Sequence, residues 1–115
     1  MQHRAQIDAA RTSNGKYDYS PCFSLVKEEI SRADIAIGNL EVTLGGKPYQ
    51  GYPTFSAPDE YLQAIKDVGF DVLLTANNHC LDRGKAGLER TITQIESFSI
   101  PYAGTYRNAI ERKQL

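Results

Sequence analysis

Apolar residues recur along the chain with two different spacings, which predict helices that alternate with short strands. Residues 58–69 and 84–98 carry apolar side chains every three or four positions, the spacing of one helix face. Residues 34–39, 71–75 and 100–103 are short apolar runs typical of buried strands. Together with a helix before the first strand, this order predicts an α/β domain with a parallel sheet.

The helical pattern is weaker toward the amino terminus. Residues 1–13 predict a poorly amphipathic helix that ends at an Asn14-Gly15 turn. A better helix is expected from Ser20 to Ala33, because Ser20-Pro21 is typical of an N-cap followed by proline. The apolar positions of this segment have helical spacing: Phe23, Val26, Ile30 and Ala33.

Residues 43–57 contain glycines, prolines and aromatic residues, and they predict a long loop. A long loop beside a sheet edge is commonly a lid or a specificity element. The alternative is that the aromatic side chains pack the loop onto the body of the domain.

Composition narrows the class of protein. The chain has 115 residues, which is one domain at most, and 41% of them are hydrophobic. The net charge is −1 and the basic residues are scattered, so we expect no nucleic-acid partner. No stretch reaches the ~20 apolar residues of a membrane span, and we expect no signal peptide. Cys22 and Cys80 are expected to be small buried hydrophobes rather than a disulfide framework.

Polar side chains gather where two of the predicted strands end. Asn39 and Glu41 follow the first strand, and Asn77, Asn78 and His79 follow the second. The carboxyl ends of neighbouring parallel strands lie about 4.8 Å apart, so Asn39, Glu41, Asn78 and His79 are expected to reach one small ligand. Amide, imidazole and carboxylate groups suit divalent metals and phosphate chemistry. The alternative is a polar turn after each strand.

Three further residues leave alternatives open. Asp82 lies three residues after His79 and could be a ligand, a partner that orients the imidazole, or the N-cap of the next helix. A Cys80 nucleophile served by His79 is disfavoured, because neighbours in such a turn usually point apart. His3 is the only other histidine and, taken alone, predicts a surface residue.

Four motifs stand in a characteristic order along the chain: Asn39-Leu40-Glu41, Thr75-Ala76-Asn77-Asn78-His79 with Asp82 and Gly84, Thr91, and Pro101-Tyr102-Ala103-Gly104. They resemble those of the CapA-type proteins of bacterial poly-gamma-glutamate capsule biosynthesis, which belong to the calcineurin-like metallophosphatase superfamily. The resemblance implies a partial metallophosphatase-like layered α/β fold over residues 1–115, with parallel strands and flanking helices, whose first strand and C-terminal part are missing.

The resemblance also implies a divalent metal, Mn, Zn, Fe or Mg, in the complete domain. Asn78 would be a metal ligand as part of the superfamily's Asn-His signature, and Glu41 would stand at a metal- or substrate-binding position. His3 becomes a third candidate ligand, because Met1-Gln2-His3 is similar to the residues that follow the family's first strand. No metal is expected in the short chain alone.

The remaining roles concern catalysis and substrate. By resemblance, His79 would contact phosphate or act as an acid, and Asp82 would orient it. Asn39, Asn77 and Tyr52 would contact an anionic polymer or a phosphorylated substrate.

The function implied is that of a fragment of a capsule or cell-envelope polymer biosynthesis protein, with a membrane association for the full-length protein. The alternative is a non-catalytic α/β module that binds an anionic polymer or a partner protein. Three short parallel strands also leave an unpaired edge, which predicts self-association.

Overall fold

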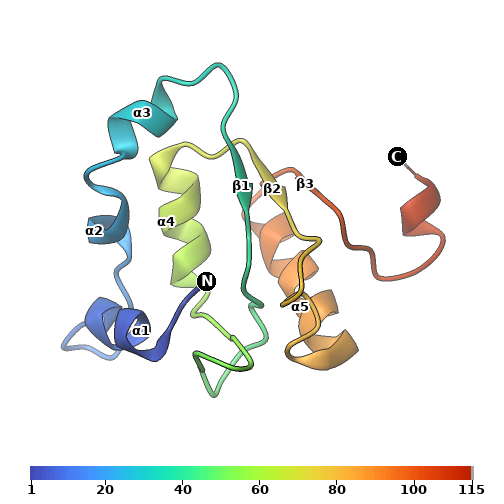
Figure 1. Ribbon diagram of the computed structural model, residues 1–115, viewed down its shortest axis with the longest axis horizontal. Coiled ribbons are helices and arrows are strands. Elements are labelled where there is room, and N and C mark those ends of the chain that lie inside the picture. Colours follow the sequence, from blue (N-terminus) through green and yellow to red (C-terminus); the bar gives the residue numbers. More distant parts are fainter. Residues whose placement is uncertain (115) are drawn as a thin grey trace.

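A three-stranded parallel sheet and its two crossover helices form the centre of the molecule (Figure 1). The computed structural model describes residues 1–114. The central elements in chain order are β1 (Ile37–Asn39), α4 (Glu60–Val68), β2 (Val72–Leu74), α5 (Gly84–Ser97) and β3 (Tyr102–Ala103). Both strand pairs are parallel, and the order in the sheet is β1-β2-β3. The α/β class predicted from the sequence is therefore confirmed.

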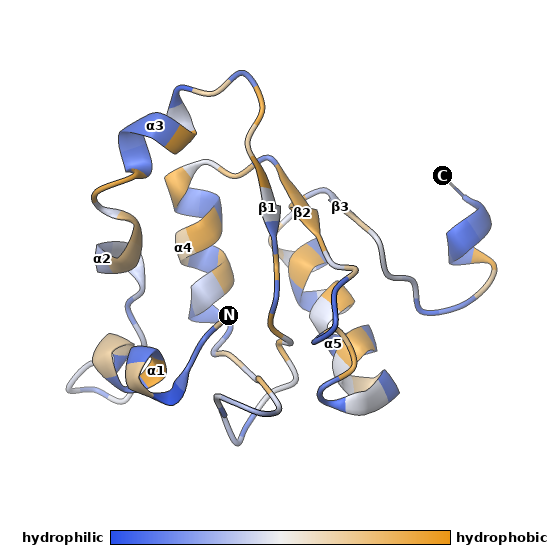
Figure 2. Ribbon diagram, viewed as in Figure 1, coloured by the Kyte–Doolittle hydropathy of each residue, from blue (hydrophilic) through white to orange (hydrophobic). Residues whose placement is uncertain are grey.

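The two crossover helices form where the apolar spacing predicts them, and Figure 2 shows hydrophobic positions recurring along both. The inward residues Leu62, Ile65 and Val68 of α4 are buried. Gly69 ends this helix with a φ of 107°, a left-handed conformation that glycine adopts without steric cost. In α5, Ile92 and Ile95 are buried.

The sheet is covered on one face only by the described residues. Because the strand order follows the chain and crossovers are right-handed, α4 and α5 lie on the same face. Leu73 points to that face and is buried. Its neighbour Leu74 is 44% exposed and Ile37 of β1 is 54% exposed, so the opposite face is open. Parallel sheets are usually covered on both faces, and this one is a partial layered fold.

The loop of residues 43–57 is packed into the core for much of its length. Leu44, Phe55 and Ala57 are fully buried and belong to the main hydrophobic cluster. This part of the loop therefore packs onto the body of the domain, as the alternative interpretation expected. Tyr52 is different, because it is 75% exposed.

The helix predicted over residues 20–33 is wrong as a single element. The structure has α2 (Ser20–Phe23) and α3 (Lys27–Ser31), and α2 has Tyr19 rather than Ser20 as its N-cap. The hydroxyl of Ser24 donates to the carbonyl of Pro21, a local bond that competes with helix continuation. Phe23 packs against the core but Val26 is exposed, so only part of the expected apolar stripe is covered.

Two smaller expectations also need correction. The amino-terminal helix, α1, spans only Arg4–Ala10. Cys22 is exposed, because the short helix α2 does not bury that side, whereas Cys80 is half-buried.

The segment after β3 returns to the body through specific polar contacts. The guanidinium of Arg107 binds the carboxylates of Glu96 in α5 and of Glu111 in the 3-10 helix η1 (Glu111–Lys113). Thr105 donates hydrogen bonds from its N–H and its hydroxyl to the hydroxyl of Thr75, at 3.0 and 2.7 Å. These contacts hold the segment after β3 against the end of β2 and against α5, although its sequence has no helical or strand-like spacing of apolar residues.

Candidate functional site at the strand ends

The ends of β1 and β2 are joined through side chains. Asn77 Nδ2 donates to Asn39 Oδ1 at 3.2 Å and to the carbonyl of Leu40 at 2.9 Å. Asn77 Oδ1 accepts the backbone N–H of His79 at 3.0 Å. One amide therefore connects both strand ends and shapes the turn that presents His79. The parallel pairing predicted this proximity, while the substrate-binding roles of Asn39 and Asn77 stay predictions.

His79 and Asp82 form a close, largely buried pair. The distance from His79 Nδ1 to Asp82 Oδ2 is 2.8 Å, and the side chains are 14% and 12% exposed. Because a carboxylate only accepts hydrogen bonds, Nδ1 is the donor and Nε2 keeps its lone pair in the neutral imidazole. The N-cap of α5 is Arg83, so the alternative of Asp82 as N-cap is wrong. The catalytic roles of the pair stay predictions.

Phe55 is a part of the site that the sequence did not single out. Its backbone N–H donates to Asp82 Oδ2 at 2.8 Å. Its ring lies edge to face with His79 at a centroid distance of 4.7 Å, and with His3 at 5.2 Å. The sequence marks Phe55 only as one of the aromatic residues of the long loop, and nothing in that pattern separates it from the others.

The candidate metal ligands form only part of a donor set. Asn78 is exposed and Glu41 is half-buried, so their oxygen donors are at least partly open to solvent. Such oxygens suit a hard divalent cation. Within residues 1–114, however, no three His, Cys, Asp or Glu side chains come together in a way that could hold a metal ion. The fit is therefore partial: Glu41 and Asn78 offer oxygen donors, but among the described residues they do not join a cluster of three His, Cys, Asp or Glu side chains.

His3 lies beside the site through its ring contact with Phe55, whereas Tyr52 follows a glycine that packs against the same amino-terminal segment. His3 precedes α1, and its N–H donates to Gln6 Oε1 at 2.8 Å. Gly51 lies so close to this segment that a Cβ there would be 2.6 Å from the backbone nitrogen of Arg4. Tyr52, the next residue, is thereby held near the start of the chain and exposed to solvent.

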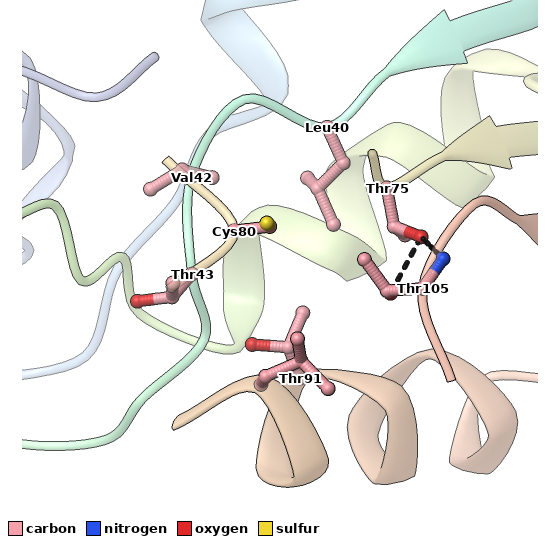
Figure 3. Close-up of a pocket in the computed structure, with 8 residues that line it drawn as sticks. Leu40, Val42, Thr43, Thr75, Cys80, Thr91 and Thr105 are labelled. Atoms are coloured by element: carbon pink, nitrogen blue, oxygen red, sulfur yellow. Dashed lines mark hydrogen bonds between the residues drawn. The ribbon is translucent and has the colours of Figure 1, made fainter. Parts of the chain in front are cut away.

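A small cavity lies beneath the strand ends (Figure 3). Its volume is about 10 Å³, roughly the space for one water molecule, which is too small for a substrate. The sulfur of Cys80 points into this cavity, whereas His79 is bonded to Asp82. The structure therefore does not pair Cys80 with His79. The cavity is lined by Leu40, Val42, Thr43, Thr75, Cys80, Leu88, Thr91 and Thr105.

The chain is an α/β protein with a parallel sheet, in which Asn-Leu-Glu stands at the end of one strand and Asn-Asn-His follows the next. Comparison with known families identifies the family to which this arrangement belongs. The chain belongs to the family described as bacterial capsule synthesis protein PGA_cap, whose sequence model matches residues 1–115. This membership agrees with the resemblance to CapA-type proteins.

Individual relatives support this membership. Over 106 residues the chain is 28% identical to the capsule biosynthesis protein CapA of Bacillus anthracis, covering 87% of this chain and 26% of that protein. Over 95 residues it is 33% identical to the uncharacterized proteins y4sH and y4uA of Sinorhizobium fredii (strain NBRC 101917 / NGR234), covering 75% of this chain and 20% of each. The chain thus spans about a quarter or less of the length of these relatives.

Proposed function

We propose that the strand-end site belongs to a metallophosphatase-type hydrolase that acts on a phosphorylated substrate in the synthesis of a capsule polymer of the poly-gamma-glutamate type. The observation that carries the proposal is the His79–Asp82 pair, held at 2.8 Å beside the joined ends of β1 and β2. An imidazole with one nitrogen fixed and the other free is suited to proton transfer or to contact with a phosphoryl oxygen.

His79 would act as the acid. In its protonated form, Nδ1–H is donated to Asp82, whose carboxylate stabilises the imidazolium, and Nε2–H is free to donate. During hydrolysis, a water oxygen forms the new bond to phosphorus and the bond to the leaving oxygen breaks. His79 would give its Nε2 proton to that leaving oxygen. Asn39 and Asn77, joined to each other, would border the substrate.

Glu41 and Asn78 would contribute oxygen ligands to a divalent metal, Mn, Zn, Fe or Mg, with His3 as a third candidate and other ligands from outside residues 1–114. When bound, such a metal polarises a phosphoryl oxygen and lowers the pKa of a coordinated water. The partly solvent-open oxygens of Glu41 and Asn78 support this assignment.

The test compares the chain with a version extended at both ends by its neighbouring sequence. We expect bound metal in the extended protein by elemental analysis, and turnover of p-nitrophenyl phosphate. His79→Ala should lower kcat by about 10²- to 10⁴-fold, the usual contribution of a general acid, with metal content unchanged. Asn78→Ala should lower metal content. A metal-free extended protein, or full activity in His79→Ala, would contradict the proposal.

The second candidate function is a non-catalytic module that binds an anionic polymer or a partner protein. Two observations favour it for the chain as it stands: within residues 1–114 no three His, Cys, Asp or Glu side chains lie together as a metal site, and Tyr52 presents an exposed ring. In this case poly-glutamate binding, measured by calorimetry, should survive His79→Ala and weaken in Tyr52→Ala. The hydrolase proposal predicts loss of turnover in the first variant instead.

We also propose a cell-envelope location for the full-length protein, supported by its membership of a capsule synthesis family. None of the helices within residues 1–114 has the length and apolar character needed to span a bilayer. Fractionation of cells with an antibody to the protein tests the location. Recovery in the soluble cytoplasmic fraction alone would contradict it.

A further inference from the structure

Phe55 lies between the only two histidines of the chain. The planes of its ring and of the His79 imidazole meet at 80°, with centroids 4.7 Å apart. On the His3 side the angle is 83° and the distance 5.2 Å. Aromatic pairs prefer such edge-to-face arrangements, because the positive edge of one ring meets the negative face of the other. A fully buried phenyl ring therefore borders both imidazoles.

The backbone of Phe55 binds the same carboxylate that His79 binds. Asp82 Oδ2 accepts the N–H of Phe55 and the Nδ1–H of His79, each at 2.8 Å. Rotation of the carboxylate away from this position would break both bonds. Phe55 thus limits the movement of Asp82 through its main chain and that of His79 through its ring.

Phe55 itself is fixed from both sides of its peptide. Its carbonyl accepts the hydroxyl of Thr43 at 2.6 Å, and the next residue, Ser56, pairs with Gln50 through two backbone hydrogen bonds of 2.8 and 3.0 Å. Its ring is part of the main hydrophobic cluster. The position of Phe55 is therefore set by the core, and Phe55 in turn contacts Asp82 and His79 from that fixed position.

We propose that Phe55 is a positioning residue for His79. Its ring holds the imidazole plane and its N–H holds Asp82, so that His79 keeps the Nδ1–H tautomer and Nε2 keeps one direction. The consequence for turnover rests on the proposed function, whereas the geometry can be tested without any activity.

The first test is NMR of the imidazole nitrogens of His79 in the chain. Phe55→Leu keeps the backbone N–H and a buried apolar side chain but removes the aromatic ring. We expect one Nδ1–H tautomer in the unmutated protein and a mixture of Nδ1–H and Nε2–H tautomers in Phe55→Leu. The matched control is Phe98→Leu, the same substitution in a residue that packs on the same core without a ring contact to His79. An unchanged tautomer in folded Phe55→Leu would overturn the proposal.

A second measurement needs no variant and decides the matter if Phe55→Leu does not fold. Nuclear Overhauser contacts should join the ring protons of Phe55 to those of both His79 and His3. Their absence in the folded, unmutated chain would also overturn the proposal.

The activity arm uses the extended protein and p-nitrophenyl phosphate. Phe55→Leu should lower kcat by about 10- to 100-fold, because small misplacements of a catalytic group are costly, with KM nearly unchanged. Unchanged kcat would contradict the positioning role. If the tautomer changes while even the unmutated extended protein is inactive, the hydrolase proposal fails and the positioning role of Phe55 stands.

Discussion

Asn77 donates a 3.2 Å hydrogen bond to the side-chain oxygen of Asn39, which ties the end of β2 to the end of β1. The same amide also binds the carbonyl of Leu40 and the N–H of His79. The turn that carries His79 is therefore built on one side chain, while the adjacent Asn78 is exposed.

Replacing Asn77 with alanine should destabilise the fold. The change leaves the Leu40 carbonyl and the His79 N–H without this partner, and we expect a loss of about 1–3 kcal/mol in the free energy of unfolding, measured with urea. Asn78→Ala is the matched control and should change stability by less than ~0.5 kcal/mol. Equal losses in the two variants would show that Asn77 does not tie the strands.

Gly104→Ala should be more destabilising than Gly15→Ala. Gly104 has a φ of 120°, and a Cβ there would be 2.7 Å from the backbone nitrogen of Ala76, just before Asn77. Gly15 has a φ of 76° but open space around it. Both variants carry backbone strain of about 1–3 kcal/mol, and only Gly104→Ala adds a steric clash. Thermal unfolding of both variants checks this order. A lower melting temperature for Gly15→Ala than for Gly104→Ala would contradict the prediction.

The sequence predicted the parts of the site that depend on the sheet. Short apolar runs between periodic helices led to parallel strands, and parallel strands brought Asn39 and Asn77 together. Gly69 likewise marked the end of α4, because a left-handed helix end depends on the glycine itself and not on distant parts of the chain.

Other features depend on contacts between segments far apart in the chain. Asp82 looked like an N-cap from its position, but it binds His79 and Phe55 instead, and Phe55 lies 27 residues away from it. The single helix predicted over residues 20–33 was wrong because periodicity cannot tell how far the core extends. Phe23 packs against the core, but the helix face is not covered at the next apolar position. Val26 is exposed for that reason.

The pH dependence of stability should have a contribution from Glu96. Its hydrogen bond with the Arg107 guanidinium holds the pKa of this carboxyl below its usual value of 4.5. A lowered folded-state pKa means that the stabilisation is present above the unfolded-state pKa and is lost as the pH falls through the folded-state pKa. Glu96→Gln should therefore be less stable than the unmutated chain at pH 7, and the gap should close in acid.

Urea unfolding of both proteins at pH 7 and at acidic pH measures that gap. Glu28→Gln serves as the control, because Glu28 forms a fully surface-exposed pair with Arg32 at 3.5 Å, and such pairs contribute little. A gap for Glu96→Gln that stays constant over the whole pH range would contradict the assignment to the Arg107 contact.

The open edge of β1 predicts self-association. On either side of β1, the Leu40 N–H donates to the Leu74 carbonyl and the Ala36 carbonyl accepts the Val72 N–H, so the backbone groups of the even-numbered positions 36 to 40 face β2. The backbone groups of Ile37 then face the free edge, and its side chain is 54% exposed.

A lysine at an edge strand opposes pairing with another chain. Light scattering should therefore show mass rising with concentration for the unmutated chain and staying at the monomer value for Ile37→Lys. Ile110→Lys places the same charge on an exposed isoleucine outside the sheet and should behave like the unmutated chain. An unmutated chain that remains monomeric at millimolar concentration would show that this edge does not pair with another chain.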